Sequence, residues 1–386
     1  MKITLIDNND RSLLNFRGDL VRTLVQLGHS VSVITPAGGF VKDIEFLGAQ
    51  HYAVPLARRS LNPFSDWFYY CRIRKILKTI RPGIVETMTV KPNIWGVLAA
   101  KSAGVPRIVS LVAGAGEVFN DGTGLKQQLV RSAVSFFYRF AGKYVGKYWF
   151  LNSENRDLFV KLKICRPEQA VVIISEGVNL QQFSPDSVSA EQTQKIRREF
   201  GADTDSVVIG CYPGRNLRSK GGLIFYEAAK IAERWNKNVR FVLAGSYDPQ
   251  EKDSIPDDFV QTAAIFKHFP ARPDIVEMLA ATDILVFPSY YPEGVPRILL
   301  EGLAMHKPLI TTGSVGCRET VDNGVNGFLV PPKNPQALAD AVRKLVDDKD
   351  LRQRFGKAGY AKAVNQFDVH KINERVIREF LDIPAV

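Results

Sequence analysis

The 386-residue sequence has few cysteines and lacks a metal-ligand cluster. Its four cysteines are far apart, with no CxxC or Cys/His grouping: Cys71, Cys165, Cys211 and Cys317. This spacing indicates neither a zinc site nor a disulfide framework, and it fits a cytoplasmic protein best.

Long apolar runs and repeats are also missing. Residues 1–7 reach a carboxylate after one short apolar run, which is too little for a signal peptide. No stretch approaches the roughly 20 uncharged apolar residues that a membrane span needs. The absence of a fixed-period repeat argues against solenoids and propellers. We therefore expect a chain that neither leaves the cytoplasm by this route nor spans a membrane.

What is present is a regular alternation of strand and helix patterns. Hydrophobic residues make up 45% and charged residues 24%, the balance of a globular protein. The β-rich runs are 3–6, 31–34, 84–86, 108–111 and 171–174, and the second half adds runs of the kind buried on both faces at 207–211, 239–244, 284–287 and 309–312. Stretches with helical spacing lie between these runs, and this order predicts parallel, doubly wound sheets. We predict an α/β protein with two Rossmann-like domains.

A polar stretch at 176–204 separates the two sets of runs and places the domain boundary near residue 185. The predicted domains are 1–185 and 186–365, followed by a C-terminal helix at 366–386 that could cross back to the first domain. Ligands of doubly wound sheets bind at the carboxyl ends of the strands. Two such domains facing each other would form a cleft that holds one ligand from each side.

The net charge of +11 lies entirely in the first half of the chain. Residues 1–180 hold 24 Lys and Arg against 13 Asp and Glu, whereas residues 181–386 hold 27 of each. Two segments, 58–81 and 126–150, mix cations with aromatic residues at helical spacing. Such helices either lie at an anionic membrane surface or pack into their own core. We expect an anionic membrane surface as a partner, and no nucleic acid.

The strongest motif follows the predicted strand that ends at Phe287. A loop with two prolines and a glycine leads into a helix near Val295, where free amides around Gly294 and Val295 could bind a phosphate. Glu293 and Glu301 lie two turns apart, on nearly the same side of this helix. Such carboxylates could accept hydrogen bonds from sugar hydroxyls, or be a helix-terminal acid and a solvated surface acid.

A second motif follows the predicted strand 207–211. Gly214 and two further glycines accompany the cations Arg215, Arg218 and Lys220 at this strand-to-helix turn. A diphosphate needs such a loop, with a planar guanidinium, a point charge and close backbone approach, although an ordinary basic turn has the same composition. No Walker A sequence is present.

Other parts of the sequence argue against a dinucleotide or metal cofactor. The glycine-rich segment 111–120 lacks the GxGxxG order and does not follow the first strand. Two Asp-x-Asp pairs, 203–205 and 348–350, fall where turns are expected. We therefore expect no metal and no cofactor.

The motifs together resemble a known family. The matching segments of the second half are 288–289, 293–296, 301–302, 307–308, 316–319 and 323–330. They are similar to the donor domain of retaining GT-B glycosyltransferases of family 4, whose hallmark is E-x7-E. Segments 59–64, 91–94 and 114–116 resemble, more loosely, a subgroup that extends polyprenyl-diphosphate-linked glycans.

The resemblance implies a GT-B fold and a set of roles for the donor side. Arg215 and Lys220 would bind the donor diphosphate, and Glu301 the ribose hydroxyls. Glu293 would contact the transferred sugar, with the Gly294 and Val295 amides near phosphate. The implied catalytic residues are Glu293, Arg215 and Lys220.

The acceptor side departs from the family pattern. The first loop carries Arg17 where many members have a glycine pair, and the segment with Gly114, Gly116 and Glu117 lacks the usual histidine. Either Glu117 or Lys91 would take the place of that histidine.

The predicted function is transfer of a hexose or N-acetylhexosamine, with retention, from a nucleotide diphosphate sugar to a lipid-linked or glycan acceptor. A UDP-sugar is the favoured donor, cell-surface polysaccharide or glycan synthesis the expected process, and the inner face of the membrane the expected location. Two alternatives remain at this point: a two-domain NAD(P)-dependent oxidoreductase and a non-catalytic sugar-binding protein.

Overall fold

The computed structural model describes residues 1–58, 60, 62–114, 119, 124–202, 204, 207–235, 238–249, 251, 253–256, 264–291 and 294–383, without the side chains of 125–127. The chain divides into two compact units. Unit 1 comprises Met1–Glu176 and His370–Val386, and unit 2 comprises Gly177–Val369. Residue 185, near which the sequence placed the domain boundary, begins a short 3-10 turn, Pro185–Ser187, within unit 2.

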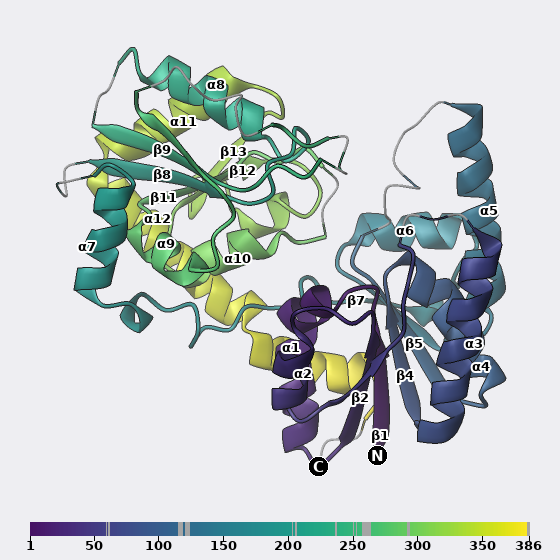
Figure 1. Cartoon of the computed structure of the whole chain (residues 1–386). Coiled ribbons are helices and arrows are strands. Elements are labelled where there is room, and N and C mark those ends of the chain that lie inside the picture. Colours follow the sequence, from purple (N-terminus) through teal and green to yellow (C-terminus); the bar gives the residue numbers. More distant parts are fainter. Residues whose placement is uncertain are drawn as a thin grey trace. The chain divides into compact units, whose positions relative to one another are not determined.

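Unit 1 is built on a seven-stranded parallel sheet with the order β3-β2-β1-β4-β5-β6-β7 (Figure 1). Its strands are β1 Lys2–Ile6, β2 Ser30–Thr35, β3 Gln50–Ala53, β4 Ile84–Met88, β5 Arg107–Val112, β6 Lys147–Phe150 and β7 Ala170–Val172. Its helices are α1 Asp10–Gln26, α2 Val41–Phe46, α3 Pro63–Ile80, α4 Val97–Ser102, α5 Leu125–Gly142 and α6 Ser153–Lys161, with a π-helical turn, Pro92–Gly96, before α4.

Each face of this sheet has its own hydrophobic core. Leu13 of α1 and Leu5 of β1 belong to one core, and Ile73 of α3 and Val85 of β4 belong to the other. The C-terminal helical segment, α13 Val369–Arg375 and the π-helical Val376–Phe380, joins the α1 core. The ring of Phe380 contacts that of Trp149 on β6 with centroids 5.6 Å apart. Strands β1 and β4 are buried because helices cover both faces.

Unit 2 repeats this plan with a six-stranded parallel sheet of order β10-β9-β8-β11-β12-β13. Its strands are β8 Val208–Pro213, β9 Val239–Ala244, β10 Phe266–Phe269, β11 Ile284–Phe287, β12 Leu309–Thr312 and β13 Gly327–Val330. Its helices are α7 Ala190–Glu199, α8 Gly222–Ala232, α9 Ile275–Ala281, α10 Arg297–Ala304, α11 Pro335–Asp347 and α12 Lys349–Lys362, which continues into a π-helical segment, Ala363–Phe367.

The predicted α/β class is confirmed, and both sheets are doubly wound. In each, the first strand lies in the middle and the chain then builds outward in both directions, so that β1 neighbours β4 and β8 neighbours β11. These neighbouring pairs are the topological switch points, where ligands of such sheets bind at the carboxyl ends of the strands.

One sequence expectation about segment 126–150 is wrong. Its last residues, Lys147–Phe150, form the interior strand β6 instead of continuing a helix. Tyr148, Trp149 and Phe150 are buried there, so these aromatic residues belong to the cores of unit 1 and not to a membrane surface.

Candidate active site

The switch point of unit 2 brings both donor-side motifs to one edge of the sheet. Strand β8 leads through residues 214–221 into α8, and the neighbouring strand β11 leads through residues 288–296 into α10. Because the two strands are parallel and adjacent, their following loops leave the same edge side by side.

Backbone contacts fix the β8–α8 loop against the segment after β11. The amides of Tyr290 and Tyr291 donate to the carbonyl of Ser219 at 2.9 and 3.1 Å. Gly221 has φ +86°, and a Cβ there would lie 2.3 Å from the Pro288 carbonyl oxygen. Only glycine combines this backbone conformation with so close an approach. The loop therefore has a defined position relative to β11.

The N-termini of α8 and α10 both lie at this edge. Their N-cap residues, Gly221 and Pro296, offer no side-chain acceptor for the first-turn amides. Such amides, together with the positive end of the helix dipole, attract anions. Gly294 is half-buried and Val295 is buried at the entrance to α10, which begins at Arg297 and not at Val295 as the sequence suggested.

The two predicted diphosphate ligands lie in the same loop. Arg215 is exposed, and its carbonyl accepts a hydrogen bond from the Tyr212 hydroxyl at 2.9 Å. The Lys220 ammonium lies 5.5 Å from the centroid of the Phe287 ring, which stacks on the ring of Tyr212. Aromatic rings at the ends of β8 and β11 thus support the loop that carries both cations.

Glu301 is held inside α10 by its own helix. The Nε of Arg297, one turn earlier, donates to its Oε1 at 2.8 Å, and Glu301 is only 7% exposed. Burial raises the pKa of this carboxyl, and the Arg297 charge opposes that rise. A Cβ on Gly302 would lie 2.2 Å from Leu285, so this glycine lets α10 pack closely on β11. Glu301 is therefore a rigidly placed acceptor. Glu293 lies outside the described residues.

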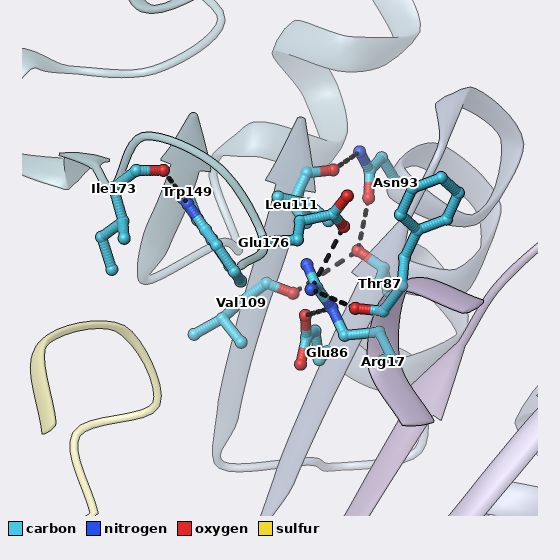
Figure 2. A network of polar contacts seen from close by, with 10 residues as sticks. Arg17, Glu86, Thr87, Asn93, Val109, Leu111, Trp149, Ile173 and Glu176 are labelled. Carbon is cyan, nitrogen blue, oxygen red and sulfur yellow. Dashed lines mark hydrogen bonds and ion pairs between the residues drawn. The ribbon is translucent and has the colours of Figure 1, made fainter. Parts of the chain in front are cut away.

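Arg17, expected on the acceptor side, lies in a buried network at the switch point of unit 1 (Figure 2). Its Nε contacts Glu86 Oε1 and its Nη1 contacts Glu176 Oε1, both at 3.1 Å. The guanidinium also lies 4.4 Å from the centroid of the Trp149 ring. The Arg17 and Glu86 side chains are 2% and 0% exposed. Arg17 therefore binds carboxylates of its own chain.

The other acceptor-side residues are placed differently. Lys91 donates to Asp66 at 2.5 Å and to the Ala57 carbonyl at 2.8 Å, which ties the segment after β4 to α3. Gly114, just after β5, is half-buried with open space where a Cβ would point. Gly116 and Glu117 lie outside the described residues.

Asp7 follows β1 at the same switch point. It is 2% exposed, and burial raises the pKa of its carboxyl to about 7, while the Asn8 amide and the Arg17 charge oppose the shift. An unfolded Asp ionises near pH 4, so between about pH 4 and 7 the unfolded chain releases a proton that the folded chain retains. Stability is therefore lost as the pH rises through this window.

We expect Asp7→Asn to remove this loss. The variant should gain on the order of 4 kcal/mol over the parent at pH 8, as an upper bound, and little at pH 4. Melting temperatures of both proteins across this range provide the measurement. An advantage that stays constant with pH would contradict the raised pKa.

Sequence reasoning missed Glu86, Asp7 and Arg297. A carboxylate inside the apolar run 84–88 indicates a buried cationic partner, and an Arg four residues before Glu301 indicates a helix pair. Both signals are visible in the sequence. The partner of Glu86 is not, because Arg17 lies 69 residues away.

Two features are absent from the described residues. These residues contain no group of three or more His, Cys, Asp or Glu side chains arranged to hold a metal ion. No helix in that part of the chain combines the length and hydropathy required to cross a bilayer.

Comparison with known proteins agrees with this arrangement. Residues 192–362 match the family described as glycosyl transferases group 1, and residues 16–173 match the glycosyl transferase 4-like domain. A Campylobacter jejuni relative, N,N'-diacetylbacillosaminyl-diphospho-undecaprenol alpha-1,3-N-acetylgalactosaminyltransferase, is 30% identical over 98% of both chains. An Escherichia coli relative, UDP-Gal:alpha-D-GlcNAc-diphosphoundecaprenol alpha-1,3-galactosyltransferase, is 26% identical over 92% of this chain and 89% of its own.

Solved structures share the fold. A glycosyltransferase from Rickettsia africae superposes with a TM-score of 0.82 at 22% identity, covering 99% of each chain. Anabaena HepE in complex with UDP and glucose superposes with a TM-score of 0.80 at 19% identity, covering 99% of this chain and all of its own.

The chain belongs to the glycosyl transferases group 1 family. It has the predicted GT-B fold and is a glycosyltransferase. This membership sets aside the oxidoreductase and the non-catalytic sugar-binding protein as alternatives.

Proposed function

We propose that this enzyme transfers a sugar from a UDP-sugar to a saccharide linked through diphosphate to a polyprenyl lipid, as a step in polysaccharide or glycan synthesis. The printed activities of the Campylobacter jejuni and Escherichia coli relatives, both on undecaprenyl-diphosphate-linked acceptors, support this substrate class. The donor is a UDP-hexose or UDP-N-acetylhexosamine.

One observation carries the donor assignment. Two helix N-termini and the cations of the β8–α8 loop converge at the switch point between β8 and β11. This combination suits a diphosphate, because amides, helix dipoles and cations all favour negative charge there. We assign the diphosphate to Arg215, Lys220 and the amides near Gly214, Gly294 and Val295.

The two carboxylates take the remaining donor roles. Glu301, buried and fixed by Arg297, accepts hydrogen bonds from the ribose hydroxyls. Glu293 contacts the transferred sugar, a role that rests on its place in the E-x7-E motif.

The transfer retains the configuration of the sugar by a front-face reaction. The acceptor hydroxyl oxygen forms a bond to the anomeric carbon while the bond from that carbon to the β-phosphate oxygen breaks. The hydroxyl proton passes to the leaving phosphate, and UDP departs. Negative charge grows on the diphosphate as the bond breaks, so Arg215 and Lys220 stabilise the transition state more than the ground state.

The acceptor meets unit 1 at a membrane surface. The first half of the chain carries all of the net positive charge, which suits the anionic inner face of a membrane. We therefore place the enzyme in the cytoplasm, peripherally attached to that face. Of the acceptor-side residues, Gly114, Gly116 and Glu117 remain candidates for contact, whereas Arg17 and Lys91 act through their ion pairs.

We expect Glu301→Gln to weaken UDP binding about tenfold or more, because an amide is a poorer partner for ribose hydroxyls than a carboxylate. Calorimetric titration of UDP measures this change. Glu277→Gln, the same substitution on α9 of the same unit, serves as the matched control. Equal UDP affinity in Glu301→Gln and the control would remove the ribose role.

The function is tested by a transfer assay. The enzyme is incubated with UDP- and GDP-sugars and an undecaprenyl-diphosphate-linked monosaccharide, and the lipid product is followed by mass spectrometry. We expect a mass gain of one sugar with a UDP-sugar, an α linkage from an α donor by NMR, and undiminished turnover in EDTA. Transfer only from GDP-sugars, or only to free glycans, would contradict the proposed substrates.

A further inference from the structure

An aromatic groove in unit 1 lies outside the switch point and plays no part in the donor site. It has a volume of about 320 Å³ and opens between α3, the π-helical turn with α4 that follows it, and the end of α5. Five of its eight lining residues are aromatic: Trp67, Tyr70, Trp95, Phe140 and Tyr144. This volume lies at the low end of the range for small-molecule sites, large enough for part of an extended apolar chain.

Contacts among the rings give the groove a defined shape. Trp67 stacks on Tyr70 with centroids 5.2 Å apart, and Phe140 meets Tyr144 edge-on at 6.0 Å. The ring of Trp95 contacts that of Phe137 with centroids 5.5 Å apart. A preformed aromatic wall loses little conformational entropy when an apolar ligand binds.

The helices α3 and α5, which border the groove, also carry other exposed apolar side chains. Phe64 and Phe68 of α3 are 74% and 66% exposed, and Phe136 of α5 is 63% exposed. Trp67 and Phe140, which line the groove itself, are 57% and 44% exposed. Large apolar surfaces of this kind mark sites of interaction with lipid or with another apolar partner.

The charge of the helices that border the groove favours an anionic partner. Helices α3, α4 and α5 carry eight Lys and Arg, four on α3, one on α4 and three on α5, against the single carboxylate Asp66. That carboxylate is already paired with Lys91. Lys101 lines the groove, and Arg74 bonds to the lining residue Ser102 at 2.8 Å. An aromatic groove edged by cations fits a lipid with an apolar chain and a phosphorylated head.

We propose that this groove binds part of the isoprenoid chain of the lipid-diphosphate acceptor. The proposal rests on the proposed function for the identity of the lipid. The groove would select the acceptor by its chain as well as by its sugar, and hold it while its saccharide reacts.

Acceptor kinetics test this selection. The same saccharide diphosphate is offered in detergent on an undecaprenyl chain and on a short, water-soluble alkyl chain. We expect the parent enzyme to prefer the long chain by about tenfold or more in kcat/KM, and Trp67→Ala/Phe140→Ala to lose most of that preference. Phe46→Ala, which removes a 92% exposed ring from α2 of the same unit, should keep it.

A second pair of changes separates the groove from the surface around it. If Phe64→Ala/Phe68→Ala lost the preference while Trp67→Ala/Phe140→Ala kept it, the lipid would lie on the exposed surface and the groove proposal would be overturned. An unchanged preference in both double variants would overturn it as well.

If neither acceptor is turned over, that result contradicts the proposed function. A binding measurement then still tests the groove. Trp67 and Trp95 are two of four tryptophans and report on the groove directly. Farnesyl diphosphate should change tryptophan fluorescence saturably, with about tenfold weaker binding in Phe140→Ala than in Phe46→Ala. Equal binding of farnesyl diphosphate and inorganic diphosphate by the parent would show that no chain site exists.

Discussion

Replacing Arg215 or Lys220 by alanine is expected to lower turnover about a hundredfold or more, a loss of roughly 3 kcal/mol of transition-state stabilisation. Each change removes a positive charge from the loop that approaches the leaving diphosphate. Arg215 is exposed and Lys220 is half-buried at the edge of the sheet, so neither substitution opens a cavity in the core. Steady-state kinetics with saturating donor and acceptor measure the effect.

The matched control is Arg198→Ala, which removes an exposed cation from α7 of the same unit. It should leave turnover within about twofold of the parent, because exposed charges away from the site are screened by salt. Parent-like rates in both Arg215→Ala and Lys220→Ala would remove the diphosphate assignment. A loss in the control as large as theirs would point to general charge effects instead.

The second large effect is on stability. Arg17→Met is expected to destabilise the protein by about 3–5 kcal/mol, because it leaves the buried Glu86 without its cation. Urea denaturation followed by tryptophan fluorescence measures the change, since Trp149 packs against the guanidinium of Arg17. Arg22→Met is the matched control: the same substitution on the same helix breaks only an exposed pair with Asp19, which should cost less than about 1 kcal/mol.

A double variant distinguishes a structural role from an acceptor-binding role for Arg17. Arg17→Met/Glu86→Leu replaces the Arg17–Glu86 pair by apolar groups, leaves only the 12% exposed Glu176 without Arg17, and should recover most of the lost stability. Recovery of stability and activity together would make Arg17 a structural residue. Parent-like stability of the Arg17→Met single variant would contradict the buried network.

The central strands were predictable because both of their faces are buried. Their sequences are short apolar runs, as in β4, β9 and β11, and helices cover them on each side. Four strands were missed: β3 and β10, which lack such a run, and β6 and β13, whose sequences are apolar. Three of these, β3, β10 and β13, lie at sheet edges, where a strand has fewer neighbours and needs fewer apolar residues. Strand β6 lies inside the sheet, but its aromatic sequence continued the pattern of the preceding helix.

The donor side of the candidate site could be predicted from the sequence, whereas the acceptor-side contacts could not. The donor-side residues belong to local strand–loop–helix motifs, so their spacing in sequence already brought Arg215 near Lys220, and Glu301 near Val295. The acceptor-side expectations for Arg17 and Lys91 could not include their partners, because Glu86, Glu176 and Asp66 come from distant segments that only the folded sheet brings close.

The measurement that tests the donor assignment most directly is a calorimetric comparison of UDP and UMP. If the β8–α8 loop and the two helix N-termini hold the diphosphate, the parent enzyme should bind UDP at least about tenfold more tightly than UMP, since the second phosphate adds charge-assisted hydrogen bonds. That difference should disappear in Arg215→Ala/Lys220→Ala and persist in Arg198→Ala. Equal affinity of the parent for UDP and UMP would contradict the account.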